Sequence, residues 1–292
     1  MKSVTMGFVA VGLAACFAFT VLTAVGQPPP GPKSFVVFDG TLYSDKPDLS
    51  AYGIQPITTA YAGKFGPDWN KHADRLPDLQ AVQAVAREAQ QKGHVVVLDI
   101  EHWPLKGSAE SVRDSQTKYK TVLEWFRAAA PGLSVGYYGA PPIRDYWRAI
   151  KDTSSQERRS WMAENDQLRS LAGAVDVLFP SLYTFYPDQA GWKKYAIAQI
   201  EEARRYGNGK PVYVFLMPTY HDSNRLLGGQ FLSPDYWLLE LETAREYADG
   251  IVIWGGWGSD NRPAKWDDRA PWWEKTQEFM SIQGRSRLGP SN

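Results

Sequence analysis

Short apolar segments alternate with longer segments of helical periodicity over most of this 292-residue chain. Each short segment is rich in β-branched, aliphatic or aromatic residues and stops at a polar or aromatic residue, which is typical of a buried strand. The predicted strands cover residues 34–39, 57–61, 94–101, 133–138, 175–180, 211–216 and 251–254. Helices are predicted at 77–92, 109–129, 144–172, 190–206, 233–249 and from 271 onward. This alternation implies parallel βα units, and therefore a barrel or a doubly wound sheet.

Polar and aromatic side chains recur where these strands end, and their recurrence favours the barrel. A doubly wound sheet concentrates its site at one switch point, whereas a barrel gathers the ends of all its strands around one rim. The residues concerned are Asp39, Tyr61, Glu101, Tyr138, Ser181, Tyr183, Tyr220 and Trp254. We therefore predict a single α/β domain of seven strands, whose exposed aromatic rings offer flat faces for stacking sugars.

The third predicted strand carries two carboxylates at its end. Asp99 and Glu101 are two residues apart, so on a strand they point to the same face, about 6.6 Å apart along the chain. In an α/β barrel, catalytic groups lie at this end of the strands. Two like charges so placed cannot both ionise cheaply, so one carboxyl is expected to keep its proton near neutral pH. A protonated acid beside an ionised one suits cleavage of a glycosidic bond, whereas a purely structural interpretation has the two acids cap the next helix.

Other kinds of site lack their motifs. The chain has no G-x-S-x-G, Walker or G-x-G-x-x-G sequence, and its four histidines show no H-x-x-x-H pairing. We therefore expect no nucleophile elbow, no cofactor and no metal site, although His102 and His221 are candidates for the lining of the pocket. Acidic and basic residues balance at 32 each, without a basic run, so nucleic acid is not an expected partner.

The N-terminal segment is a separate matter from the fold. Lys2 precedes an apolar run over residues 6–25, which predicts a secretory leader or an N-terminal membrane anchor within residues 1–26. Cys16, the only cysteine, ends a lipobox-like Leu-Ala-Ala-Cys, but the apolar run continues beyond it, which favours cleavage near Gly26 or retention over lipidation. We expect a secreted or periplasmic protein, tethered to the membrane if the run is retained. Residues 27–33 are a Pro-rich linker, 34–283 the catalytic barrel without disulfides, and 284–292 a tail.

Five short motifs follow one another between residues 90 and 260. They are DIEHWP at 99–104, VGYYGAP at 135–141, MAEND at 162–166, VLFPSLY at 177–183 and DGIVIWG at 249–255. In this order they resemble motifs of the hyaluronidase family of glycoside hydrolases, namely D-x-E-x-W-R-P, W-G-Y-Y-x-x-P, M-x-E-N-D, L-x-P-S-x-Y and D-G-x-x-x-W-G. The chain departs from the first motif because it lacks the Arg before Pro104, and it lacks the disulfides of the animal enzymes.

The resemblance implies a distorted TIM-like (β/α)7 barrel and a role for each site residue. Glu101 would be the general acid and then the base, and Asp99 would orient and polarise an acetamido group of the substrate. Tyr183 and Trp254 would shape the sugar subsite. Tyr138 and Tyr220 complete the predicted substrate-binding set, Tyr220 because it falls near the position of a further tyrosine of the family.

The expected activity is that of an endo-acting N-acetylhexosaminidase on a polysaccharide or oligosaccharide. Because Asp99 and Glu101 leave one strand on one face, Asp99 is badly placed to attack the anomeric carbon from behind. The substrate's own 2-acetamido oxygen is the expected nucleophile, a known exception to the paired-carboxylate rule, and this predicts net retention of configuration. A muramidase-like hydrolase of wall glycan and a non-catalytic glycan-binding barrel remain as alternatives. A chitinase would need acids where His94 and Val97 stand.

Overall fold

The computed structural model of the protein describes residues 35–66, 68–71, 74–258 and 260–288. Contacts divide the chain into Met1–Lys33 and Ser34–Asn292, and the second unit contains all of the described residues. The predicted leader or anchor, Cys16 and the linker lie outside the described residues. Within those residues no helix combines the length and the apolar character needed to cross a lipid bilayer.

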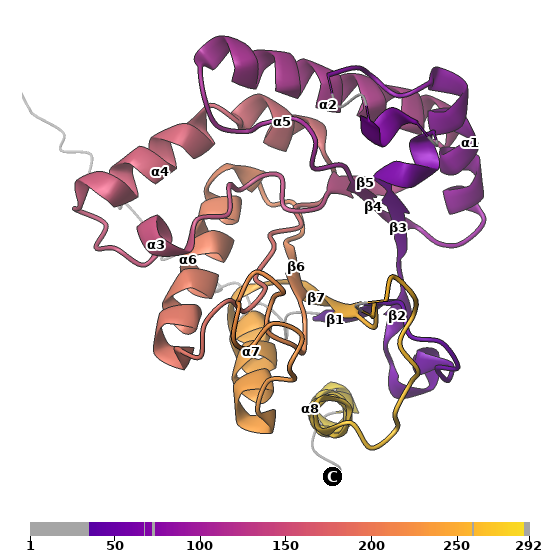
Figure 1. The fold of residues 1–292 in the computed structure, drawn as a ribbon, viewed down its shortest axis with the longest axis vertical. Helices are drawn as coiled ribbons and strands as arrows, with labels where there is room; N and C mark the ends of the chain where they lie inside the picture. The colour runs from indigo at the N-terminus through magenta and orange to yellow at the C-terminus, as the bar shows by residue number, and fades with distance from the viewer. Residues whose placement is uncertain (1–34, 67, 72–73, 259, 289–292) are drawn as a thin grey trace, which may run out of the picture. The chain divides into compact units, whose positions relative to one another are not determined.

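Parallel strands form two sheets in the described part of the chain (Figure 1). The first sheet has the order β2-β1-β7-β6, and the second has the order β3-β4-β5. The strands are β1 (Val36–Thr41), β2 (Gln55–Pro56), β3 (Thr58–Tyr61), β4 (Val95–Asp99), β5 (Ser134–Tyr137), β6 (Tyr213–Leu216) and β7 (Gly250–Gly255). Six of the seven predicted strands are thereby confirmed to within two residues at each end.

Two irregular segments stand where a closed barrel would have continuous strands. Residues 55–61 divide between β2, which pairs with β1, and β3, which pairs with β4. Residues 176–182 make isolated bridges only, from Phe179 toward β5 and from Leu178 and Ser181 toward β6. The regular strands therefore form an open, distorted α/β barrel in place of one closed sheet.

The prediction of a regular strand at 175–180 was wrong. Pro180 has no N–H to donate, so its contact with β6 is limited to its carbonyl, which accepts from the Phe215 N–H at 2.9 Å. On the other side the Val177 carbonyl approaches β5 so closely that a Cβ on Gly136 would lie 2.1 Å from its oxygen. The segment fills the strand position through these close approaches without forming a regular ladder.

The helices cover the outside of the sheets. In Figure 1, α1 and α2 lie beside β3 to β5, whereas α7 and α8 lie beside β1 and β7. The helices are η1 (Leu49–Tyr52), η2 (Ala62–Phe65), η3 (Trp69–Lys71), α1 (Leu79–Gln90), α2 (Ala109–Ala129), α3 (Tyr146–Ala149), α4 (Gln156–Asp166), α5 (Arg169–Ala174), α6 (Gln189–Gly207), α7 (Pro234–Tyr247) and α8 (Pro271–Leu288). The helix predicted at 144–172 divides into α3, α4 and α5, because Asp145 and Ser155 each cap a new N-terminus. The last helix continues to Leu288, past the end predicted for the barrel at 283.

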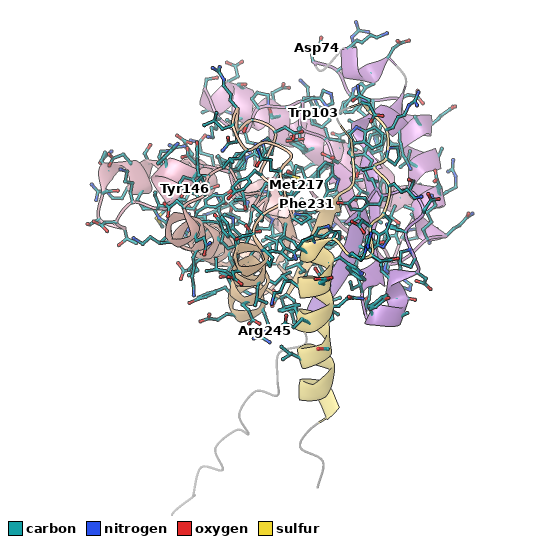
Figure 2. All side chains as sticks on the ribbon, turned by 60° about the horizontal axis from the view of Figure 1, so that its bottom comes forward. Asp74, Trp103, Tyr146, Met217, Phe231 and Arg245 are labelled. Carbon is teal, nitrogen blue, oxygen red and sulfur yellow. The ribbon has the colours of Figure 1, made fainter. Side chains whose placement is uncertain are left out.

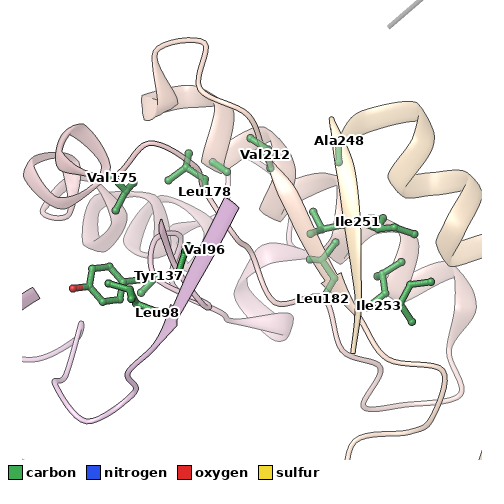
Figure 3. Packing of buried hydrophobic residues seen from close by; sticks show 14 of the residues in the cluster. Val96, Leu98, Tyr137, Val175, Leu178, Leu182, Val212, Ala248, Ile251 and Ile253 are labelled. Atoms are coloured by element: carbon green, nitrogen blue, oxygen red, sulfur yellow. The ribbon is translucent and has the colours of Figure 1, made fainter. Parts of the chain in front are cut away.

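Alternate residues of each strand pack on opposite faces. Val97 packs inward with Met217, which lies near the middle of Figure 2, and with other residues of an inner cluster. Val96 and Leu98 pack outward in the larger cluster beneath the helices, where Figure 3 shows them with residues such as Ile251. Both faces of the strands are therefore apolar, as expected for a parallel sheet covered by helices. Phe215 and Met217 of the inner cluster also line a cavity at the carboxyl end of β4.

Candidate active site

Asp99 and Glu101 line one cavity of about 210 Å³ at the carboxyl end of β4. Asp99 is the last residue of the strand, and Glu101 follows in the exposed loop. Ile100, between them, is fully buried in the outer cluster. The alternation of strand side chains therefore continues for two residues past the strand, and it places both carboxyl groups on the same side.

The carboxyl with the perturbed proton affinity is that of Asp99. Its burial, and to a lesser degree the negative charge of Glu101, raise the pKa of Asp99 from 3.8 to about 7. Burial disfavours the ionised form because the low-dielectric surroundings replace the water that would solvate it. The expectation that one acid of the pair keeps a proton near neutral pH is thus met by the inner acid, while Glu101 is the exposed one.

Three aromatic residues from different parts of the barrel form a wall of this cavity. The ring of Tyr183 lies 5.8 Å from that of Trp254 and 5.9 Å from that of Tyr138. Trp254 Nε1–H donates to the Tyr61 hydroxyl at 3.0 Å, and the Tyr138 and Ser181 hydroxyls are 3.0 Å apart. These bonds fix the rings in place, so the wall has one shape before any ligand binds. The structure therefore brings three of the four predicted substrate-binding residues together with the two acids.

A second cavity, of about 350 Å³, lies beside the first. Glu101, Tyr138 and Arg144 line both cavities, so the Glu101 carboxyl faces a continuous groove. Trp103 and Lys106 line the second cavity but not the first. A linear polymer could thus occupy positions on both sides of Glu101, which an acid that protonates the oxygen between two sugars requires.

Several cavity residues were not predicted from the sequence. They are Thr59, Arg144, Phe215, Met217 and Asp222 in the first cavity, together with Lys106 in the second. Arg144 comes only three residues after the VGYYGAP motif, and this nearness to a predicted strand end was the one sequence feature that pointed to its place in the cavity. His221, a candidate, lines the first cavity, and burial lowers its pKa, with a smaller effect in the same direction from Arg144.

The MAEND motif on α4 holds the loop that carries Arg144. Asn165 is fully buried, and its side-chain oxygen accepts the Ile143 N–H at 2.8 Å. Its amide group donates to the Trp161 carbonyl at 3.0 Å, and Trp161 Nε1–H donates to the Ile143 carbonyl at 2.9 Å. Both backbone groups of Ile143 are thereby fixed, and with them the start of the loop at Arg144. The Asn of this motif therefore has a positioning role.

Tyr220 and His102 lie away from the cavity that contains both acids. The ring of Tyr220 packs against Tyr236 of α7 at 6.4 Å, and Tyr220 is not among the residues that line either cavity. The physical reason is a turn of the chain after β6, in which the backbone N–H of Tyr220 donates to the Gln230 carbonyl at 2.9 Å. The ring of His102 packs against that of Trp69 at 4.8 Å, and His102 lines neither cavity.

The described residues contain no group of three or more His, Cys, Asp or Glu side chains that could hold a metal ion.

No family model matches the chain, and no curated protein sequence matches it. Solved structures, in contrast, are similar to it. The crystal structure of bee venom hyaluronidase is similar with a TM-score of 0.56 at 18% sequence identity, over 87% of this chain and 96% of that one. The structure of bee venom hyaluronidase in complex with a hyaluronic acid tetramer gives a TM-score of 0.59 at 18% identity, over 88% and 97% of the two chains.

The similarity extends over nearly the whole of both chains, and at this identity it establishes the fold. The fold is an open α/β barrel, which the alternation of strands and helices and the residues at the strand ends predicted. It is similar to the fold of bee venom hyaluronidase, and the resemblance based on the five motifs is confirmed at the level of the fold.

Proposed function

We propose that the protein is a glycoside hydrolase that cleaves a polysaccharide containing N-acetylhexosamine, with Glu101 as general acid and then base. The observation that carries the proposal is the pair of Asp99 and Glu101 in one cavity at the carboxyl end of β4. The likeness in fold to bee venom hyaluronidase supports the same reaction class.

The proposed role of Glu101 rests on its place in the groove. It lines both cavities, so a sugar on either side leaves the glycosidic oxygen within reach of its carboxyl group. Proton transfer to that oxygen makes the sugar a better leaving group, and the resulting carboxylate can then accept a proton from the attacking water. A single residue therefore serves both half-reactions.

Asp99 is proposed to act on the acetamido group. It reaches the sugar from the same side as Glu101, so it cannot attack the anomeric carbon from the opposite face. The acetamido oxygen of the substrate forms that bond instead and gives an oxazolinium ring, which water then opens. Ionised Asp99 accepts a hydrogen bond from the acetamido N–H and balances the positive charge of the ring. A pKa of about 7 leaves a substantial ionised fraction of Asp99 at neutral pH.

The charges around the groove favour a substrate that also carries carboxylates. Arg144 lines both cavities, and Lys106 lines the second, where its amino group is also 3.5 Å from Asp145. The opposing charges are the carboxyl groups of Asp99, Glu101 and Asp222, which all line the first cavity, whereas only that of Glu101 also lines the second. The second cavity, which has two cations and one carboxyl group, suits the uronic acid of hyaluronan or chondroitin better than a neutral chitin-like chain.

The test is hydrolysis of a panel of glycans by the wild-type protein and by Glu101→Gln. Gln keeps the size and hydrogen-bonding capacity of Glu but cannot donate the proton, so the rate should fall by roughly 10²- to 10⁴-fold. Glu110→Gln, an exposed change in the first turn of α2, is the matched control and should hydrolyse at the wild-type rate.

The panel contains hyaluronan, chondroitin, chitin oligosaccharides and bacterial wall glycan. Cleavage of wall glycan alone would support the muramidase-like alternative, and binding without any cleavage would support a glycan-binding barrel. Near-wild-type hydrolysis by a well-folded Glu101→Gln protein would remove Glu101 from its proposed role.

A further inference from the structure

Two large aromatic side chains are exposed beside the groove. Trp147 of α3 is 59% exposed and Tyr186, in the loop before α6, is 38% exposed. Their ring centres are 5.3 Å apart, at an interplanar angle of 47°. Together with Tyr146 they form what we call the aromatic platform, and Tyr146 is labelled to the left of Met217 in Figure 2. Clustered exposed rings are unusual on a soluble surface and mark binding sites.

Contacts of Tyr146 hold the rings of the platform in one arrangement. Tyr146 packs against Trp147 at 5.1 Å and Tyr186 at 5.2 Å, and its other neighbour at 5.3 Å is the fully buried Tyr195. The Tyr146 hydroxyl also donates to Asp188, the N-cap of α6, at 3.4 Å. A ligand that binds the exposed rings would therefore not have to order them first, which lowers the entropic cost of binding.

A row of ring contacts connects the platform with the cavity. Tyr183, in the wall of the cavity, stacks on His221 at 6.1 Å, and His221 lies 4.7 Å from Phe185. Phe185 in turn lies 6.4 Å from Tyr186 of the platform. Arg144 lies over Phe185, 5.3 Å from the ring centre, and so borders both the cavity and this row.

The two loops that form the row are tied to each other. Asn224 Nδ2–H donates to the Phe185 carbonyl at 2.7 Å, and the backbone N–H of His221 donates to the Thr184 carbonyl at 2.8 Å. The path from the acids to the platform is therefore a fixed surface of rings and one cation.

We propose that the aromatic platform is a distal sugar-binding subsite for the polysaccharide that occupies the groove, an inference that rests on the proposed function. Aromatic rings pack against the apolar C–H faces of sugars, and the polar edges of Tyr and Trp remain available for hydroxyl groups. The occupant follows from the continuity of the surface with the cavity, because a linear chain leaving the acids meets the row and then the platform.

This subsite gives the protein a preference for long chains over short ones. A short oligosaccharide fills the cavities around Glu101 alone, whereas a long one gains the platform as well. The affinity for the long chain should therefore depend on Trp147 and Tyr186 much more than the affinity for the short one.

The experiment compares Trp147→Ala and Tyr186→Ala with Tyr52→Ala. Tyr52 of η1 is 39% exposed, nearly the same as Tyr186, and packs against Trp273 at 4.9 Å, so it controls for the loss of an exposed ring. Dissociation constants are measured in a Glu101→Gln background for hyaluronan and chitin oligosaccharides as tetrasaccharides and as long chains. The KM values of the same substrates are measured in the background with Glu101 intact.

Each platform substitution should weaken long-chain binding by about tenfold or more, equivalent to about 1.4 kcal/mol, and should reduce the ratio of long-chain to short-chain affinity. Tyr52→Ala should keep the wild-type ratio. Hydrolysis with an unchanged ratio in both platform variants would overturn the platform and leave the proposed function standing. Platform-dependent binding without any hydrolysis would support the platform and contradict the proposed function. A self-association that the platform substitutions abolish, without any effect on glycans, would identify the surface as a contact between copies of the chain.

Discussion

Asp99 combines burial with a neighbouring like charge, and both raise the free energy of its ionised form. In the folded protein its pKa is about 7, against a reference value of 3.8. Near neutral pH Asp99 is therefore divided between its protonated and its ionised form, and the ionised form costs stability. Strain of this kind is expected where a group is placed for chemistry in preference to stability.

Asp99→Asn should remove this cost, and the effect should depend on pH with a definite sign. Below about pH 4 the carboxyl is protonated in both the folded and the unfolded state, so Asp99 has no pH-dependent effect there. As the pH rises from about 4 to about 7 the unfolded chain releases its proton first, so the wild type loses stability. The free energy of unfolding of Asp99→Asn should thus exceed that of the wild type by about 2–4 kcal/mol at pH 8, and the excess should shrink toward acid pH.

Denaturant unfolding of both proteins across this pH range measures the difference. Asp68→Asn is the control for a change at a surface Asp, because that side chain is 74% exposed. Equal stabilities of the wild type and Asp99→Asn at every pH would contradict the raised pKa. Turnover should respond in the opposite sense, since Asp99→Asn removes a charge that is needed mainly in the transition state.

Arg144 offers a prediction about which glycan is bound. Arg144→Gln removes the cation that borders both cavities, so the KM for hyaluronan should rise by about tenfold while that for chitin oligosaccharides changes little. Steady-state kinetics on the two substrates give the comparison. Arg159→Gln, on the exposed side of α4, serves as the control. Equal effects of Arg144→Gln on both substrates would count against a carboxylate-bearing substrate.

At the scale of elements, the sequence predicted regular segments well and irregular ones poorly. The bounds of α2 match the prediction at both ends, because Ser108 caps its start and Pro131-Gly132 follows its end. Residues 175–180 have the composition of a strand, but a proline and a close backbone approach to Gly136 prevent a regular ladder. Those features depend on the neighbours in space, which the local pattern does not contain.

The same distinction holds for the site. Asp99, Glu101, Tyr138, Tyr183 and Trp254 could be predicted because each stands at a strand end or in a motif. Tyr220 could not be placed from the alternation, because the turn that follows β6 directs its ring toward α7. Arg144 and Asp222 lie in loops, whose course does not follow a period, and only the nearness of Arg144 to the VGYYGAP motif pointed to the site.

Asn165 shows how one buried residue links two elements. Asn165→Ala removes the acceptor of the Ile143 N–H and leaves that buried group unpaired, which should cost about 1–3 kcal/mol of stability. The loop at Arg144 should also lose its fixed position, so the KM should rise even where the protein is fully folded. Thermal unfolding and kinetics at a low temperature separate the two effects. Gln156→Ala on the exposed surface of α4 should stay within about 0.5 kcal/mol of the wild type. A folded Asn165→Ala protein with wild-type KM would show that the loop does not depend on this bond.

At the scale of the whole molecule, the open barrel gathers side chains from distant parts of the sequence around one groove. Tyr61 bonds Trp254 across 193 residues, and Tyr138 bonds Ser181 across 43. Because the walls come from different strands, their shape depends on the barrel as a unit. The two acids both come from the end of β4, however, and this single origin determines the proposed mechanism, since both approach the sugar from one side.

The most direct test of this account is NMR of the first-formed product of hydrolysis, together with an assay on the same glycan after N-deacetylation. Participation of the acetamido oxygen replaces the leaving group with inversion, and water then opens the ring with a second inversion. We therefore expect net retention of the anomeric configuration and no cleavage of the deacetylated glycan. A product of inverted configuration, or equal cleavage of the deacetylated glycan, would contradict the account.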